Sequence, residues 1–263
     1  MKIQPFLTYF YFSLVLSFLT LSLSSCKDDD PTPEELTGTV SDIEGNVYPT
    51  VKIGDQIWMA KNLRTTQYND GSVIDYPGID TLEWQNNTTG AIAWQNNNEM
   101  LKDIYGGLYN WYAINNSRGL CPAGWRVSTP EDWRILLKYL LDEHGLTNDH
   151  SGDNCAGNAL KSCRQVDSPM GGDCDTDIHP RWNFNETQYG TDDFGFAAFP
   201  GGIRDANGVY KWMGFFAYWW AHDPIIDTGF DATQRFINYD QCPVYGMQKR
   251  DKNSGLSVRC VKN

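Results

Sequence analysis

The N-terminal 25 residues limit which part of this chain can belong to a folded domain. Lys2 is the only charged residue before Cys26, and residues 6–23 are dominated by Phe, Leu, Tyr and Val. A basic start, an apolar stretch and small residues at its end are the three parts of a secretory signal. We therefore expect residues 1–25 to be a signal peptide that is removed. The fold is then built outside the cytoplasm, where disulfides persist.

The end of this stretch carries a short motif. Leu23-Ser24-Ser25-Cys26 resembles the lipobox of bacterial lipoproteins. The resemblance implies cleavage before Cys26, acylation of its thiol and its amino group, and stable anchoring by several acyl chains. The alternative is a retained transmembrane anchor, because roughly 20 apolar residues can span a bilayer. Only Lys27 and three aspartates follow, and these provide no basic flank for such an anchor.

Residues 26–38 are predicted to form a disordered acidic, proline-containing tether, with too little apolar content to fold. Its first residues, Cys26 to Asp30, resemble the signal that directs lipoproteins of some Gram-negative bacteria to the outer face of the outer membrane. The alternative is an ordinary solvated run of charges. We expect an outer-membrane lipoprotein, exposed at the cell surface and attached to the membrane through its lipid.

Charge and composition narrow the class of partner. The formal net charge is −12, and removing Lys2 with the signal peptide gives −12 − 1 = −13. So acidic a chain is a poor candidate for binding nucleic acid. Residues 39–263 are enough for one large domain or two small ones, and Phe, Trp and Tyr make up 14% of the chain. This composition favours a partly β domain with an aromatic core and many loops.

Six cysteines remain after Cys26, an even number that suggests disulfides in an exported protein. Six cysteines allow 15 pairings, so the residues alone leave the connectivity open. The absence of a Cys-x-x-Cys pair gives no support to a zinc ribbon or a thioredoxin-type redox site. The six are Cys121, Cys155, Cys163, Cys174, Cys242 and Cys260.

The predicted elements begin with short strands and tight turns over 39–58, followed by a long ordered loop over 65–105. One helix is clearly marked: Thr129 is its N-cap, Pro130 its first residue and Gly145 its end. A weaker helix is predicted over 158–164. Later strands are predicted at 194–199, 209–213, 216–220, 235–238 and 256–261.

Several segments together resemble the FISUMP domain, the Fibrobacter succinogenes major paralogous domain. They occur in order and with suitable spacing over residues 39–262. The segments are DIEGNVY (42–48), VKIGDQIWMAKNL (51–63), YNDG (68–71), YGGLYNWYA (105–113), LCPAGWRV (120–127), GFAAFPGG (195–202), YWW (218–220) and GLSVRCV (255–261).

The resemblance implies an α+β domain with a C-type-lectin-like fold: two helices, a twisted and mostly antiparallel sheet, and long loops. Formylglycine-generating enzymes share that fold. The lectin-like pattern also implies a disulfide between Cys121 and Cys260. Cys163 and Cys174 are then a plausible local pair, and Cys155 and Cys242 remain for a possible third. Fold alone supplies no mechanism.

Motifs for catalysis and metal binding are scarce. The sequence contains no phosphate-binding glycine loop, no His-Glu-x-x-His and no Gly-x-Ser-x-Gly. Asp173, Asp175 and Asp177 begin like a calcium loop, but Ile178 stands where the invariant glycine belongs. Asp192 and Asp193 would point to opposite faces of an extended segment. We expect no catalytic residues, no metal and no cofactor. An enzyme related to formylglycine-type oxidases is the alternative that needs a reactive thiol pair.

Aromatic residues are the remaining candidates for binding, because sugar rings stack on exposed Trp and Tyr. The alternative for each tryptophan is burial in the core. The expected function is a non-catalytic surface module that binds a glycan or an envelope or surface protein; a structural component of the envelope is the second possibility. Asp80-Thr81-Leu82 resembles a bacterial O-glycosylation acceptor at Thr81. The ligand candidates are Trp84, Trp94, Trp182, Trp219, Trp220, His222 and Asp223.

Overall fold

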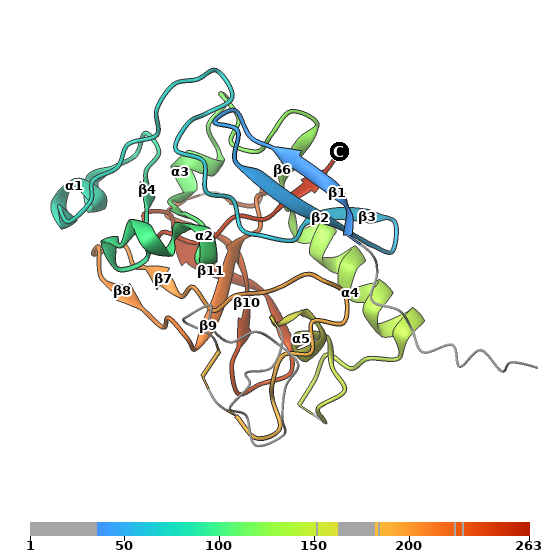
Figure 1. Ribbon diagram of the computed structural model, residues 1–263. Coiled ribbons are helices and arrows are strands. Elements are labelled where there is room, and N and C mark those ends of the chain that lie inside the picture. The colour runs from blue at the N-terminus through green and yellow to red at the C-terminus, as the bar shows by residue number, and fades with distance from the viewer. Residues whose placement is uncertain (1–35, 151, 163–181, 184, 224, 228) are drawn as a thin grey trace, which may run out of the picture. The chain divides into compact units, whose positions relative to one another are not determined.

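The computed structural model describes residues 36–150, 152–162, 182–183, 185–223, 225–227 and 229–263 (Figure 1). The predicted signal peptide, the lipidation at Cys26, the acidic turn at 173–177 and the Cys163–Cys174 pair lie outside the described residues. The first strand begins at Leu36, inside the segment predicted as tether.

The described part of the chain is mixed α/β, with short helices and mostly antiparallel sheets. Its strands are β1 (Leu36–Ser41), β2 (Val47–Ile53), β3 (Gln56–Met59), β4 (Ile92–Ala93), β5 (Leu108–Tyr109), β6 (Trp125–Val127), β7 (Ile203–Arg204), β8 (Tyr210–Lys211), β9 (Phe216–Trp220), β10 (Asp231–Asn238), β11 (Val244–Asp251) and β12 (Cys260–Lys262). Its helices are α1 (Thr81–Asn86), α2 (Lys102–Tyr105), α3 (Trp111–Ile114), α4 (Pro130–His144) and α5 (Ala156–Leu160), with 3₁₀ turns η1 (Gln95–Asn97) and η2 (Glu99–Leu101).

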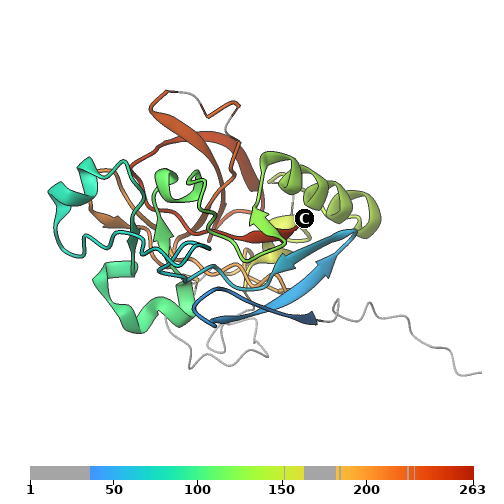
Figure 2. The same cartoon turned by 90° about the horizontal axis from the view of Figure 1, so that it is seen from above.

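Two sheets organise these elements. The larger has five strands in the order β1-β2-β3-β12-β6, so the last strand of the chain is inserted between strands from its first half. Figure 2 shows this red C-terminal strand beside the blue N-terminal strands. The second sheet has the order β11-β10-β9. Because β12 closes the larger sheet, that sheet is completed only by the end of the chain.

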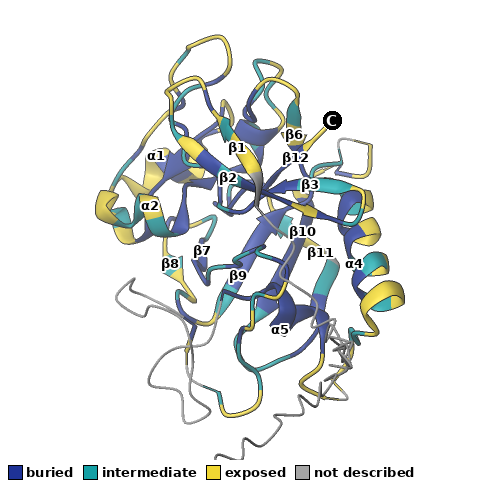
Figure 3. Cartoon of the chain, turned by 45° about the vertical axis from the view of Figure 1, so that its right-hand side comes forward, coloured by how far each residue is buried: buried dark blue, intermediate teal, exposed yellow. Residues whose placement is uncertain are grey.

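Helix α4 was predicted from its sequence and is confirmed. The Thr129 hydroxyl accepts from the backbone N–H of Asp132, and the Asp132 carboxylate accepts from that of Thr129, which forms a capping box. Gly145 ends the helix in the left-handed conformation, with φ of 63°. The side carrying Trp133, Leu136 and Leu140 is buried (Figure 3). These caps depend on neighbours in sequence, which is why sequence alone locates this helix.

Other predicted elements differ from the structure. The weaker helix is α5 and ends before its predicted range does. Residues 65–105 are not one loop, since they contain α1, β4, α2 and both 3₁₀ turns. Residues 194–199 form no strand, because Gly195 and Ala197 have positive φ of 62° and 50°. That backbone turns its carbonyl groups toward Arg259 instead of toward a neighbouring strand.

Arg259 lies at the centre of the fold and is fully buried. Its Nη1 donates to the carbonyl oxygens of Met59 and Phe196, at 2.8 and 2.6 Å, and its Nη2 donates to that of Ala197 at 2.8 Å. Its Nε donates to Oδ1 of Asn62 at 2.6 Å. Every guanidinium nitrogen thus has a partner, and one side chain connects β12 to the segment after β3 and to residues 196–197.

The main core contains aromatic residues from all these layers. Trp58 of β3, Trp133 of α4 and Trp219 of β9 are fully buried and pack together with Phe196. The ring centroids of Trp133 lie 5.2 Å from Trp58 and 5.3 Å from Trp219. Edge-to-face and tilted packing at such distances adds to the free energy of burial. This cluster fixes α4 between the two sheets.

Two disulfides link distant parts of the domain. Cys121 is bonded to Cys260, the pair that the lectin-like pattern implied, and Cys155 is bonded to Cys242. The first joins the segment before β6 to β12, across a sequence separation of 139. The second joins the residue before α5 to the segment between β10 and β11.

We expect the double substitution Cys121→Ala/Cys260→Ala to lower the free energy of unfolding by about 4–5 kcal/mol, because a long loop is no longer closed in the unfolded chain. Denaturant titration measures the change, with Cys155→Ala/Cys242→Ala as the matched variant. A Cys121 peptide recovered free and alkylated from folded, unreduced wild type would contradict the pairing.

Candidate functional site

All five tryptophans predicted to bind a ligand are buried, which corrects that prediction. Trp84, Trp219 and Trp220 are 0% exposed, and Trp94 and Trp182 are 5% exposed. Such rings have no free face on which a sugar could stack, so they belong to the core.

Internal hydrogen bonds explain why these large rings are buried. The Nε1 atoms of Trp219 and Trp220 donate to Oδ1 of Asn62 and to the carbonyl oxygen of Tyr109, at 2.9 and 2.7 Å. Trp84 donates to the carbonyl of Asp205 at 3.0 Å, and Trp182 to that of Ala198 at 2.9 Å. A buried indole N–H needs such a partner. These partners are far away in sequence.

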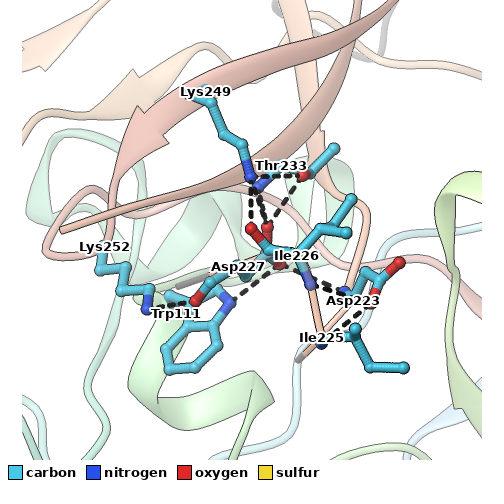
Figure 4. A network of polar contacts seen from close by, with 8 residues as sticks. All are labelled: Trp111, Asp223, Ile225, Ile226, Asp227, Thr233, Lys249 and Lys252. Atoms are coloured by element: carbon cyan, nitrogen blue, oxygen red, sulfur yellow. Dashed lines mark hydrogen bonds and ion pairs between the residues drawn. The ribbon is translucent and has the colours of Figure 1, made fainter. Parts of the chain in front are cut away.

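His222 and Asp223 lie at the start of the loop between β9 and β10, and Figure 4 shows Asp223. Nε2 of His222 lies 2.9 Å from Oδ1 of Asn115, and burial lowers the pKa of the imidazole. The Asp223 carboxylate accepts from the backbone N–H groups of Ile225 and Ile226. Asp223 therefore shapes its own loop, whereas His222 joins the start of that loop to Asn115, directly after α3.

Asp227 is the centre of this loop, and its side chain is fully buried. Its carboxylate accepts from Thr233, from Lys249 at 3.1 Å and from the indole N–H of Trp111 at 3.4 Å (Figure 4). Lys252 donates to its backbone carbonyl at 2.6 Å. Although burial opposes ionisation, the bonds from Thr233, from the backbone N–H of Asp223 and from Lys249 hold the pKa of Asp227 below its usual value.

The apolar tip of this loop is exposed. Ile225 is 84% exposed and Phe230 is 90% exposed, on either side of the bonded Asp227. Fixed apolar groups at a surface are typical of contact sites. This loop tip is one surface through which an envelope component could assemble.

A second surface lies on one face of the β9-β10-β11 sheet. Phe216 and Tyr218 alternate along β9 and lie on the same face as Phe236 of β10 and Tyr245 of β11, as the strand register requires. Trp212 continues the row, with its ring centroid 5.8 Å from those of Phe216 and Tyr218. We call these five residues the aromatic strip.

Along the aromatic strip, each ring packs against the next one. Phe216 and Tyr218 are stacked with centroids 5.3 Å apart, and Phe236 and Tyr245 with centroids 4.6 Å apart. Tyr218 and Phe236 are buried beneath their neighbours, Phe216 and Tyr245 are half-buried, and Trp212 is 40% exposed. The surface of the strip is therefore formed by Trp212, Phe216 and Tyr245.

Polar groups border the strip. The guanidinium of Arg250 lies 5.6 Å from the ring centroid of Trp212 and 5.3 Å from that of Tyr218, and its Nε donates to Gln234. Burial raises the pKa of Tyr218 to about 12, so its phenol remains a neutral donor. The Tyr245 hydroxyl bonds to Gln241. Rigid rings with a cation and polar groups at their edge can bind a sugar or a side chain without chemical change.

Sequence reasoning missed the aromatic strip, although a signal was present. Phe216 and Tyr218 have the spacing of a strand face, but the adjacent Trp219 and Trp220 are larger rings, and ring size alone does not predict exposure. Trp219 does face away from Tyr218 and Trp220, as predicted for a strand. Trp220 is nevertheless covered, because it lies at the end of β9 under the segment at Tyr109.

Two pockets are too small for a typical small-molecule site, which has about 300–1,000 Å³. One of about 230 Å³ is lined by residues that include Cys121, Arg126 and His222. Another of about 220 Å³ lies beside Asn158 and Tyr189. Among the described residues no group of three His, Cys, Asp or Glu could hold a metal ion, and no helix is long and apolar enough to cross a membrane.

The predicted glycosylation acceptor, Thr81, is the exposed first residue of α1, directly after the N-cap Asp80. Its modification stays a prediction.

Comparison with known proteins identifies the family of this chain. The chain is a mixed α/β module with curled, mostly antiparallel sheets and two disulfides in its described part. The model of the Fibrobacter succinogenes major domain matches residues 51–262, and the chain belongs to that family. No curated protein and no solved structure matches it.

Lys161, the residue after α5, is fully buried near the second pocket. Its Nζ donates to Oδ1 of Asn158 and to the carbonyl oxygens of Tyr239 and Gln241, each at 3.1 Å. Burial nevertheless lowers the pKa of the ammonium to about 7, and Asp240 opposes this shift. Lys161 therefore links the stability of the domain to pH.

We expect the free energy of unfolding to rise between pH 7 and pH 10 in wild type relative to Lys161→Met. Over that range the unfolded lysine binds a proton that the folded one has released, so increasing pH favours the folded state, by at most about 1.4 kcal/mol per pH unit. Denaturant titrations of both proteins at several pH values give their free energies of unfolding. Subtracting the value of the variant from that of wild type cancels the contribution of the other titratable groups. Parallel pH profiles would contradict this role of Lys161.

Proposed function

We propose that this chain is a lipid-anchored, surface-exposed, non-catalytic module that binds a glycan or protein ligand on the aromatic strip. The observation that carries the proposal is a continuous row of packed rings, ending in the half-exposed Trp212 and bordered by Arg250. Trp and Arg are the residues most often responsible for binding energy at interfaces. The sheet beneath keeps the rings in place, so little conformational entropy is lost on binding.

The C-type-lectin-like fold is part of the same proposal. It is supported by the position of β12, which joins the end of the chain to β3 and β6, and by the bond from Cys260 to Cys121. An oxidase of the formylglycine type would need reactive thiols. Four cysteines are bonded in disulfides, so that alternative depends on Cys163 and Cys174, which lie outside the described residues.

Trp212→Ala should weaken binding by about 1–2 kcal/mol, or roughly five- to thirtyfold, because it removes the most exposed ring of the strip. A glycan array and a pull-down from envelope extract identify the ligand, and titration of wild type and variant with that ligand gives the ratio. Phe230→Ala is the control, since it removes an exposed ring that lies outside the strip.

Equal affinity of wild type and Trp212→Ala would contradict binding on the strip. If Phe230→Ala and Ile225→Ser instead abolish association with envelope proteins, the second candidate function is favoured. That function is a structural component of the envelope, assembled through the loop tip that Asp227 holds in place.

The lipid anchor is tested separately. Radiolabelled palmitate should label wild type and not Cys26→Ala, because the lipobox resemblance makes Cys26 the acylated residue. Protease treatment of intact cells should remove the protein if it faces outward. Equal labelling of both proteins would contradict lipidation at Cys26, and survival of the intact chain would place it on the periplasmic side.

A further inference from the structure

Arg204 differs from Arg259, the other fully buried arginine among the residues that the structure describes. Both Arg204 and Arg259 are 0% exposed. Arg259 has a partner for every nitrogen, whereas Arg204 uses only Nε, which donates to the carbonyl of Gly208 at 3.2 Å. Nη1 and Nη2 of Arg204 have no hydrogen-bond partner. A buried charge without hydrogen bonds costs far more free energy than a bonded one.

No carboxylate within the described residues forms an ion pair with Arg204, although Asp205 and Asp80 favour its charged form electrostatically. The Asp205 carboxylate forms an ion pair with Lys211 at 2.6 Å and accepts from backbone N–H groups of its own turn. Asp80 caps helix α1. The guanidinium instead lies 4.3 Å from the ring centroid of Trp84 and 5.2 Å from that of Tyr210. Two rings thus hold the charged group in place while its two amino groups remain unbonded.

The same corner of the fold contains another unbonded donor. Gln95 is buried, and its Nε2 has no partner. Two residues close to Gln95 in sequence contact the tyrosines near Arg204. The ring centroid of Trp94 lies 6.5 Å from that of Tyr76, and the side chain of Asn97 accepts a hydrogen bond from the Tyr210 hydroxyl at 2.7 Å. Both tyrosines interact electrostatically with Arg204. All the unbonded atoms are donors, so a complementary ligand must supply acceptors.

We propose that Arg204 is the anion-binding residue of a carboxylate site, formed between α1, η1 and the β7–β8 hairpin. A carboxylate offers two oxygens in the geometry of the two amino groups and removes the uncompensated charge. Tyr76 is 48% exposed and interacts electrostatically with Arg204, so we expect its ring to be displaced when a ligand enters the site. Ile79, Leu82 and Val209 are exposed around this corner and provide an apolar rim for the body of the ligand.

The carboxylate can come from an acidic sugar or from the C-terminus of a peptide, and matched probes separate these sources. Galacturonate is compared with its uncharged methyl ester, and N-acetylleucine with its amide. For the acid that binds, Arg204→Met should weaken binding at least about tenfold, because the charge-assisted bonds are lost. Trp212→Ala should leave carboxylate binding unchanged, which separates this site from the aromatic strip.

Stability gives an independent readout that needs no ligand. Arg204→Met should leave the unfolding temperature unchanged or raise it, since it removes a buried charge whose amino groups have no partners. Arg259→Met should lower it strongly, because four acceptors lose their donor. The proposal is overturned if Arg204→Met destabilises the protein as much as Arg259→Met does. It is also overturned if neither acid binds wild type, or if Arg204→Met binds the acid as well as wild type does.

Discussion

The buried guanidinium of Arg259 is the interaction on which the arrangement of the domain depends. Its bonds reach the end of β3, the irregular segment at Phe196 and Ala197, and Asn62. Burial lowers its pKa to about 9, while the charge of Asp192 opposes that shift. Because every nitrogen of this guanidinium has a partner, hydrogen bonds offset much of the cost of burying its charge. The segments around Arg259 must therefore adopt one geometry, including the positive φ of Ala197.

Asn62 extends this arrangement to the second sheet. Its Oδ1 accepts from both Arg259 and the indole of Trp219, and its Nδ2 donates to the carbonyl of Tyr105. One side chain thereby positions β9, β12 and the end of α2. With β9 in place, the alternation of its side chains puts Trp219 into the core and Phe216 and Tyr218 on the opposite face. The aromatic strip is thus a consequence of how the core is assembled.

The hydrogen bonds of Arg259 and Arg204 distinguish the structural role of the first residue from the binding role that we propose for the second. Equal burial would suggest equal roles, but the bonding of the two guanidinium groups differs. Complete bonding at Arg259 stabilises a fold, whereas incomplete bonding at Arg204 costs stability that a ligand could restore. Proteins retain such unfavourable groups where they bind or react. The loop at Asp227 belongs to the first kind, because its buried carboxylate is fully bonded, while the side chains of Ile225 and Phe230 at its tip are exposed.

The sequence by itself determined features that depend on near neighbours. The capping box and Gly145 delimit α4, alternation marks β2, a short apolar run marks β9, and the order of short motifs identifies the family. Only the tertiary structure decided which rings are exposed and which cations are bonded. Trp219 and Trp220 find their hydrogen-bond partners 157 and 111 residues away, so no local pattern distinguishes them from Trp212. The exposure and the hydrogen bonding of a side chain depend on how distant segments pack together. A site defined by these two properties is therefore apparent only in the tertiary structure.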